Sequence, residues 1–202
     1  MKQVTLALIF CIMTTCALEQ AVAQATSEAP YLAVPESKRT ELGLYVTSAE
    51  AYAKWKADPD GVTIIDVRSP EEYVFVGHPE MAWNIPVKVV AHETEGEGWR
   101  LTMKSNPEFV SQVKNVAHDT DIVLVICRSG SRSAAASNLL AEAGFKQVFN
   151  VTDGVEGDRV DDPESVFHGK RLKNGWKNAG LPWTYDVDPA RMQLPPNAAE
   201  QQ

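Results

Sequence analysis

The segment from Val123 to Ala136 constrains the fold more than any other part of this 202-residue chain. A short apolar run rich in β-branched residues ends at Cys127, which is the pattern of a buried strand. A small loop with one glycine and two arginines follows, and then a helical pattern. Such a loop can turn its backbone N–H groups inward and bind an anion at the helix N-terminus. Those donors, the helix dipole and the arginines would stabilise a thiolate at the base of the loop, which favours a reactive thiol over an inert core cysteine.

Strands and helices are expected to alternate on both sides of this segment. Expected strands cover 44–46, 62–67, 82–86, 123–126 and 148–151, the last being the final one, and expected helices cover 47–56, a short stretch from Ser69, 106–117 and 132–143. The polar stretch 92–104 contains two glycines and is expected to be a loop. This order predicts an α/β fold with a central parallel sheet and helices on both faces, in three layers. A ligand would bind outside the carboxyl ends of the strands.

The N-terminus has the pattern of a signal peptide. Lys2 precedes an apolar run that is too short to span a bilayer comfortably, and small residues offer cleavage after Ala23 or Ala25. We therefore expect a signal peptide over 1–23, a flexible lead-in over 24–41, a domain over 42–187 and a polar tail over 188–202. The mature protein would be periplasmic or secreted, with no membrane anchor, although a lipoprotein modified at Cys16 stays an alternative.

Processing would change what the cysteines can do. Removal of the first 23 residues would take Cys11 and Cys16 and leave Cys127 as the single thiol, so no internal disulfide could form. The net charge of −8 disfavours nucleic acids and anionic membranes, so an anionic substrate would need a local positive site. The four histidines lack metal-ligand spacing, and we expect neither a metal nor another cofactor.

The loop and several segments around it resemble the rhodanese family of sulfurtransferases. Cys127 to Ser133 spells Cys-Arg-Ser-Gly-Ser-Arg-Ser and matches the family pattern Cys-Arg-Ser-Gly-x-Arg-Ser. Further matches follow in the family's order: Asp66-Val67-Arg68, Gly77-His78, Asn84-Ile85-Pro86, Asn174-Gly175-Trp176 and Ala179-Gly180-Leu181-Pro182. The resemblance spans about 42–182 and implies a rhodanese-like fold, with extra residues near 92–104 and 158–174. The second insertion could cover the loop as a lid or be a solvated excursion.

The resemblance implies a role for each residue of the loop. Cys127 would attack the outer sulfur of a small anionic donor such as thiosulfate and become a persulfide, which a thiol or cyanide would then accept. The residues that would bind substrate and persulfide are Arg128, Ser129, Gly130, Ser131, Arg132 and Ser133. Arg128 and Arg132 would hold the sulfonate oxygens, unless Arg132 is instead a structural residue that ties the loop to a carboxylate such as that of Glu72. Asp66, Arg68 and Glu72 are expected to be structural supports. Asp66 ends a buried strand, where an unpaired charge is costly, so it should accept hydrogen bonds from neighbouring backbone or from Arg68.

Two other functions stay open. A persulfide carrier would deliver sulfur to a protein partner with little turnover on small molecules. A cysteine-dependent phosphatase is a lesser alternative, because related phosphatases carry Cys-(x)5-Arg, whereas here only residues 128–131 separate Cys127 from Arg132.

Overall fold

The computed structural model describes residues 34–95 and 98–194. The expected signal peptide and its cleavage site lie outside these residues. The sheets and α-helices of the described residues belong to the compact unit that begins at Ser37. Within the described residues, no helix combines the length and apolar character needed to cross a bilayer.

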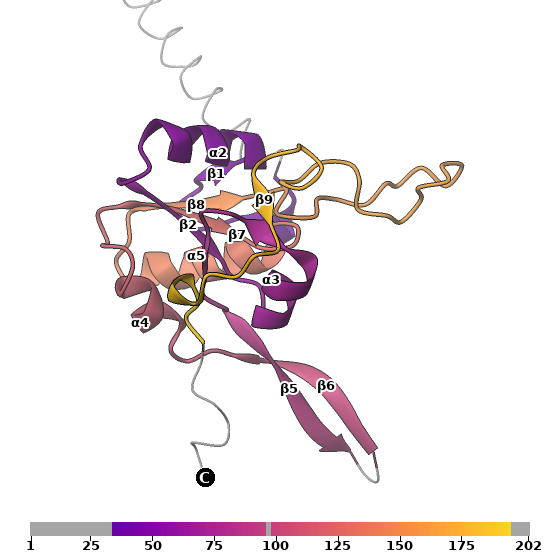
Figure 1. Cartoon of the computed structure of the whole chain (residues 1–202), viewed down its shortest axis with the longest axis horizontal. Helices are drawn as coiled ribbons and strands as arrows, with labels where there is room; N and C mark the ends of the chain where they lie inside the picture. Colours follow the sequence, from indigo (N-terminus) through magenta and orange to yellow (C-terminus); the bar gives the residue numbers. More distant parts are fainter. Residues whose placement is uncertain (1–33, 96–97, 195–202) are drawn as a thin grey trace, which may run out of the picture. The chain divides into compact units, whose positions relative to one another are not determined.

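A five-stranded parallel sheet forms the centre of this unit (Figure 1). Its strands lie in the order β1, β8, β7, β2, β4, and their bounds are β1 (Tyr45–Val46), β8 (Gln147–Val151), β7 (Ile122–Ile126), β2 (Val62–Asp66) and β4 (Trp83–Asn84). In the register of the central strands, Leu124 lies between Ile64 and Phe149. The helices are α2 (Ser48–Ala57), α3 (Pro70–Val76), α4 (Phe109–Lys114) and α5 (Ser131–Glu142).

Both faces of this sheet are buried. On β7, Val123 and Val125 point into one apolar cluster, and Leu124 and Ile126 point into another. The first cluster contains apolar side chains of α4 and α5, and the second contains Ala51 of α2. Helices therefore cover the two faces, as Figure 1 shows, and the expected three-layer α/β arrangement is confirmed.

Local sequence signals set the helix starts. Thr47 with Glu50 and Ser69 with Glu72 form complete capping boxes at the N-termini of α2 and α3. Helix α4 is shorter than expected and ends at Lys114, not near 117. Asn106 does not cap α4 directly, because its Oδ1 accepts a hydrogen bond from the backbone N–H of Glu108 in the preceding turn.

The expectation of a loop over 92–104 is wrong. Strands β5 (Lys88–Glu95) and β6 (Gly98–Ser105) pair antiparallel as a hairpin that extends away from the central sheet (Figure 1). The physical reason is the period-two alternation in β6, where Trp99, Leu101 and Met103 alternate with polar residues. These three apolar side chains are exposed, Trp99 by 70%. The hairpin therefore lacks the buried apolar face that most strands have.

A second small sheet was also not expected. Strand β3 (His78–Pro79) pairs antiparallel with β9 (Trp183–Thr184), so β8 is not the final strand. Strands of two residues carry no detectable periodicity, and this pair forms through tertiary contact. Gly77 enters it with φ of 85° and packs against Trp183, so a side chain at this position would be strained and would clash.

The two ends of the domain are more ordered than a flexible lead-in and a polar tail would be. Lys38 and Thr40 are buried, and the backbone carbonyl of Lys38 accepts a hydrogen bond from Asn150. At the other end, residues Pro189–Arg191 form a 3₁₀ turn, η2. The guanidinium of Arg191 in this turn donates a hydrogen bond to the carbonyl of Met81 at 2.8 Å. The chain from Ser37 to Leu194 is therefore part of one packed unit.

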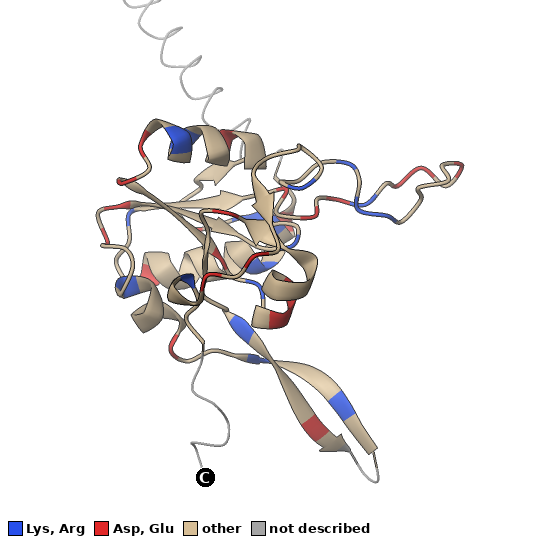
Figure 2. Cartoon of the chain, in the orientation of Figure 1, with Lys and Arg blue, Asp and Glu red and all other residues tan. Residues whose placement is uncertain are grey.

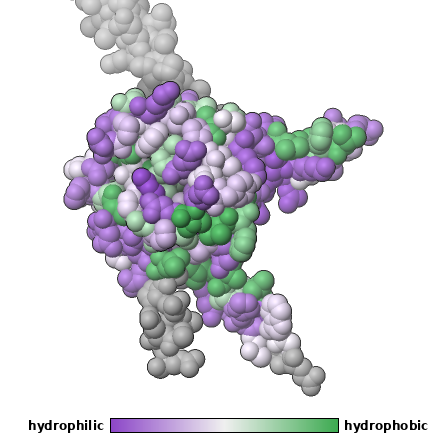
Figure 3. All heavy atoms as spheres, viewed as in Figure 1, coloured by the Kyte–Doolittle hydropathy of each residue, from purple (hydrophilic) through white to green (hydrophobic). Residues whose placement is uncertain are grey.

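The segment 158–174 forms a long arm outside the layers (Figure 1). Isolated bridges join Arg159 with Arg171 and Val160 with His168, so the outgoing and returning halves of the arm lie side by side near its base. The outer part carries exposed apolar side chains, among them Val166 and Phe167 (Figure 3). This outer part extends away from the body (Figure 1), which is the arrangement of a solvated excursion and not that of a lid folded over the active loop.

Candidate active site

Cys127 lies at the carboxyl end of β7, where the strand leads into the N-terminus of α5. Its residue surface is only 2% exposed, and it is the free cysteine of the described chain. The turn from strand to helix requires Gly130, which has φ of 99° and whose missing Cβ would collide with the carbonyl of Thr152. The glycine therefore lets the backbone fold tightly around the sulfur.

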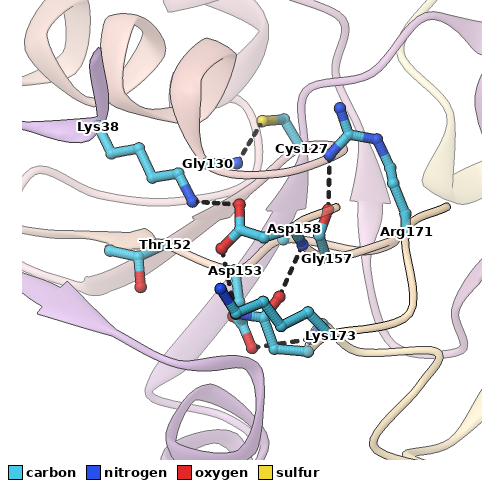
Figure 4. Close-up of polar contacts among 12 residues, drawn as sticks. Lys38, Cys127, Gly130, Thr152, Asp153, Gly157, Asp158, Arg171 and Lys173 are labelled. Atoms are coloured by element: carbon cyan, nitrogen blue, oxygen red, sulfur yellow. Dashed lines mark hydrogen bonds and ion pairs between the residues drawn. The ribbon is translucent and has the colours of Figure 1, made fainter. Parts of the chain in front are cut away.

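Two groups of the loop point donors at the sulfur. The backbone N–H of Gly130 donates to Cys127 Sγ at 3.2 Å (Figure 4), and Ser133 Oγ lies 3.4 Å from Sγ. The Ser133 hydroxyl is also 2.6 Å from Oδ1 of Asn150 and has one proton to share between these acceptors. The N–H of Gly130 is thus a dedicated donor to the sulfur, whereas Ser133 divides its proton between Sγ and Asn150.

Asn150 is a site residue that the sequence reasoning missed. It is fully buried on β8, and its amide nitrogen donates to the carbonyls of Gly130, at 3.1 Å, and Lys38, at 2.8 Å. With Ser133 on its oxygen, the side chain ties the loop, α5 and the N-terminal segment together. The available signal was a polar asparagine inside an apolar strand, Val148-Phe149-Asn150-Val151.

Arg132 contacts Glu72, the alternative that the sequence left open. The guanidinium makes a two-pronged pair with the carboxylate, at 2.5 and 2.6 Å, and joins the first turn of α5 to α3. Burial raises the pKa of Glu72, but the hydrogen bonds and charge of Arg132 outweigh burial and leave this pKa below its ordinary value. The arrangement assigns Arg132 to positioning the loop, because its fork is already occupied.

Asp66 and Arg68 form a buried pair beneath the site. Both side chains are fully buried, and the guanidinium donates to the carboxylate at 2.6 Å and to the carbonyl of Gly77 at 2.8 Å. Asn84 donates to the backbone carbonyls of both residues. A buried ion pair needs such additional hydrogen bonds to offset the loss of hydration, so these residues act as scaffold.

The segment after β8 braces the loop from behind. Backbone N–H groups of Val155 and Glu156 donate to the carbonyls of Cys127 and Arg128, at 2.8 and 3.0 Å. Gly154 permits this approach, since its φ is 64° and an added Cβ would lie 2.6 Å from the carbonyl oxygen of Cys127. These two hydrogen bonds occupy the carbonyls of Cys127 and Arg128 and hold the backbone of the loop in place.

The base of the arm also contacts this region (Figure 4). Lys38 Nζ forms an ion pair with Asp158 at 2.7 Å, and Arg171 donates to the carbonyl of Gly157 at 2.6 Å. The guanidinium of Arg171 points toward the loop that carries Cys127. The arm therefore brings residues to the site at its base, while its outer part extends away.

The remaining predicted loop residues lie around the same turn. Arg128 is exposed, Ser129 is half-buried, and Ser131 is the first residue of α5. Across residues 34–95 and 98–194, no three histidine, cysteine or acidic side chains gather closely enough to hold a metal ion.

Comparisons with known proteins agree with this geometry. The family model described as the rhodanese-like domain matches residues 48–159. A protein of Rickettsia conorii, called an uncharacterized protein, is 31% identical over 126 residues, which cover 62% of this chain and 85% of that protein. Rhodanese-like domain-containing protein 9 from chloroplasts of Arabidopsis thaliana is 40% identical over 78 residues, covering 39% of this chain and 32% of that protein.

A solved structure extends the similarity to the three-dimensional fold. The crystal structure of Rv0390 from M. tuberculosis superposes with a TM-score of 0.54 at 28% identity and covers 70% of this chain and 96% of that one. The family model, the fold and the loop around Cys127 lead to the same assignment, and the chain belongs to the rhodanese-like domain family.

Proposed function

We propose that this protein is a sulfurtransferase that carries sulfane sulfur on Cys127. The observation that supports this best is the position of Sγ, which lies at a strand end with the N–H of Gly130 directed at it and α5 starting beside it. A bound sulfur atom would extend the cysteine outward as a persulfide anion. Donors arranged in this way stabilise such an anion, and one well-placed donor is worth about 3 kcal/mol in comparable oxyanion sites.

The reaction has two displacement steps. The Cys127 thiolate attacks the outer sulfur of thiosulfate, a new S–S bond forms, and sulfite leaves with the electron pair of the old one. A nucleophile then attacks the terminal sulfur and restores the thiolate, so that cyanide becomes thiocyanate and a thiol becomes a persulfide. No oxidant or reductant is consumed, and ping-pong kinetics are expected.

The geometry disfavours the phosphatase alternative. A phosphatase would need the loop arginine to bind the phosphoryl oxygens, and Arg132 is instead held by both oxygens of Glu72. The loop from Cys127 to Arg132 is also shorter by one residue than the Cys-(x)5-Arg loop.

A persulfide carrier is the second candidate, and the exposed apolar side chains favour it. The β5–β6 hairpin carries Trp99 and Leu101, and the arm carries Val166 and Phe167, all exposed. Surfaces of this kind suit a protein partner that would accept the sulfur. We also propose that the protein is exported, on the pattern of residues 1–23, so this partner would be periplasmic or extracellular.

One set of assays separates these functions. The purified protein is incubated with thiosulfate and cyanide, and separately with an aryl phosphate, alongside Cys127→Ser. A sulfurtransferase forms thiocyanate in turnover, and the variant forms none. A carrier forms one equivalent of persulfide but turns over slowly with small acceptors. Phosphate release without persulfide or thiocyanate would overturn the proposal.

A further inference from the structure

Arginines from separate segments approach the loop of Cys127, and Figure 4 shows the guanidinium of Arg171 pointing toward it. Arg128 belongs to the loop, whereas Arg159 and Arg171 are bridged to each other at the base of the arm. Figure 2 shows basic residues along the inner part of the arm, with acidic residues both beside them and toward the tip, and two of the inner acids, Asp158 and Asp161, are paired with Lys38 and Lys173. In an acidic protein, Arg128 and Arg171 are therefore the cations at the loop that could attract an anionic substrate.

The charges of these arginines act on one another. The pKa of Arg171 lies below its ordinary value, first because of burial and then because of the positive charge of Arg128, with a smaller contribution from Arg159. Glu156 and Asp158 oppose the shift without cancelling it. Placing like charges together costs free energy, which an anion bound between them would recover.

The position of Arg171 is set by the backbone that braces the loop. Its Nη1 donates to the carbonyl of Gly157, and the neighbouring Glu156 donates its N–H to the carbonyl of Arg128. Gly157 has φ of 84° and packs against the backbone of Asn174, so no other residue would fit there without strain. The other N–H groups of Arg171 meet no hydrogen-bond acceptor among the described residues and remain available to a ligand.

Arg132 cannot serve as the second cation of the site, because Glu72 holds its fork. The side chain of Arg128 has no hydrogen-bond or ion-pair partner within residues 34–95 and 98–194. A sulfonate has three oxygens, which suit two guanidinium groups approaching from different sides.

We propose that Arg171 is a specificity-determining residue that, together with Arg128, binds the anionic end of the sulfur donor and selects dianions such as thiosulfate. The sulfur-transfer part of this inference rests on the proposed function, whereas anion binding at Cys127 does not. The sulfonate oxygens would lie on Arg128 and Arg171 with the outer sulfur toward Sγ. When the S–S bond breaks, the same two cations would hold the negative charge of the leaving sulfite.

The test compares alkylation of Cys127 by iodoacetate, an anion, with alkylation by neutral iodoacetamide. In Arg171→Gln the ratio of the two rates should fall about tenfold, the size expected when one charge contact in partly aqueous surroundings is lost. Arg171→Lys should restore much of the ratio, because it keeps the charge. Lys173→Ala is the matched control, since Lys173 is an exposed cation of the same arm, and its ratio should equal that of the wild type.

A second measurement needs no variant. Sulfate resembles thiosulfate but has no transferable sulfur, and it should slow alkylation of the wild-type thiol by iodoacetamide. An unchanged rate ratio in Arg171→Gln, an equal loss for both reagents, or no protection by sulfate would each overturn the anion site.

Sulfur donors then distinguish failure of this inference from failure of the proposed function. Persulfide formation from thiosulfate, a dianion, should depend on Arg171 more strongly than formation from methanethiosulfonate, a monoanion. If the wild type forms no persulfide but its rate ratio depends on Arg171, the proposed function fails and the anion site stands. If thiosulfate reacts equally well with the wild type and Arg171→Gln, the inference fails and the proposed function stands.

Discussion

The pair between Arg132 and Glu72 should stabilise the fold and hold the Cys127 loop in place. It joins the first turn of α5 to the first turn of α3 through two short hydrogen bonds. The perturbation that isolates it is a double-mutant cycle of Arg132→Gln, Glu72→Gln and the combined variant. Each substitution removes one charge and leaves a polar side chain of roughly similar size.

The magnitude follows from burial and geometry. Hydrogen bonds to charged groups contribute about 1.5–3 kcal/mol each, and breaking a fully buried pair costs about 3–5 kcal/mol. A quarter of each side chain is exposed, so water screens part of this interaction. We expect a coupling of about 2 kcal/mol in the free energy of unfolding.

Urea unfolding of the four proteins measures this coupling, and persulfide formation is followed in the same samples. The exposed pair of Lys173 and Asp161, 3.5 Å apart, is the matched control, and its coupling should be near zero. If Arg132 positions the loop, Glu72→Gln should impair persulfide formation about as much as Arg132→Gln. A coupling no larger than that of the control would refute this reasoning. So would Glu72→Gln with full activity beside an inactive Arg132→Gln, because that result assigns Arg132 to the substrate.

Three further predictions concern residues around the same loop. Because the folded-state pKa of Glu72 is lowered, its carboxylate stabilises the fold above its ordinary pKa of 4.5, and this contribution is lost as the pH falls through the lower value. The difference in unfolding free energy between wild type and Glu72→Gln should therefore be largest near neutral pH and shrink below pH 4.5, and a constant difference in urea unfolding would argue against the pair. Asn150→Leu should lower the free energy of unfolding by about 3 kcal/mol, measured by thermal or urea unfolding, because the buried carbonyls of Lys38 and Gly130 lose their donor. A change near zero would mean that water replaces the amide. Gly154→Ala should lower persulfide formation strongly, since its Cβ would push on the backbone of Cys127. The control Gly43→Ala has nearly the same φ, 63° against 64°, and so a similar backbone strain, but it has open space around its Cβ and should keep activity. Equal activities would show that the brace is not needed.

Local patterns in the sequence were sufficient for the sheet and the loop. The apolar strands, the capping boxes at Thr47 and Ser69, and the turn at Cys127 depend on neighbours within a few residues, and the structure has them where they were expected. The Asp66–Arg68 pair followed from the cost of a buried charge beside an available partner.

Features that depend on tertiary contact were harder to predict. Asn150 receives its partners from residues 112 and 20 positions away in the chain, and the two-residue strands β3 and β9 have no signal of their own. The hairpin of β5 and β6 is hard to predict because the polar composition and two glycines of 92–104 indicate a loop more strongly than the alternation at Trp99 and Leu101 indicates a strand. The position of Arg171 depends on how the arm folds back on itself, which no local pattern encodes.

The most direct test of the account is the intact mass of the purified protein before and after incubation with thiosulfate. We predict that the wild-type protein gains the mass of a single sulfur atom, that cyanide removes it, and that peptide mapping places it on Cys127. Cys127→Ser should gain nothing under the same conditions. An unchanged mass in a folded wild-type protein, or a sulfur atom that persists in Cys127→Ser, would contradict the claim that Cys127 carries the sulfur.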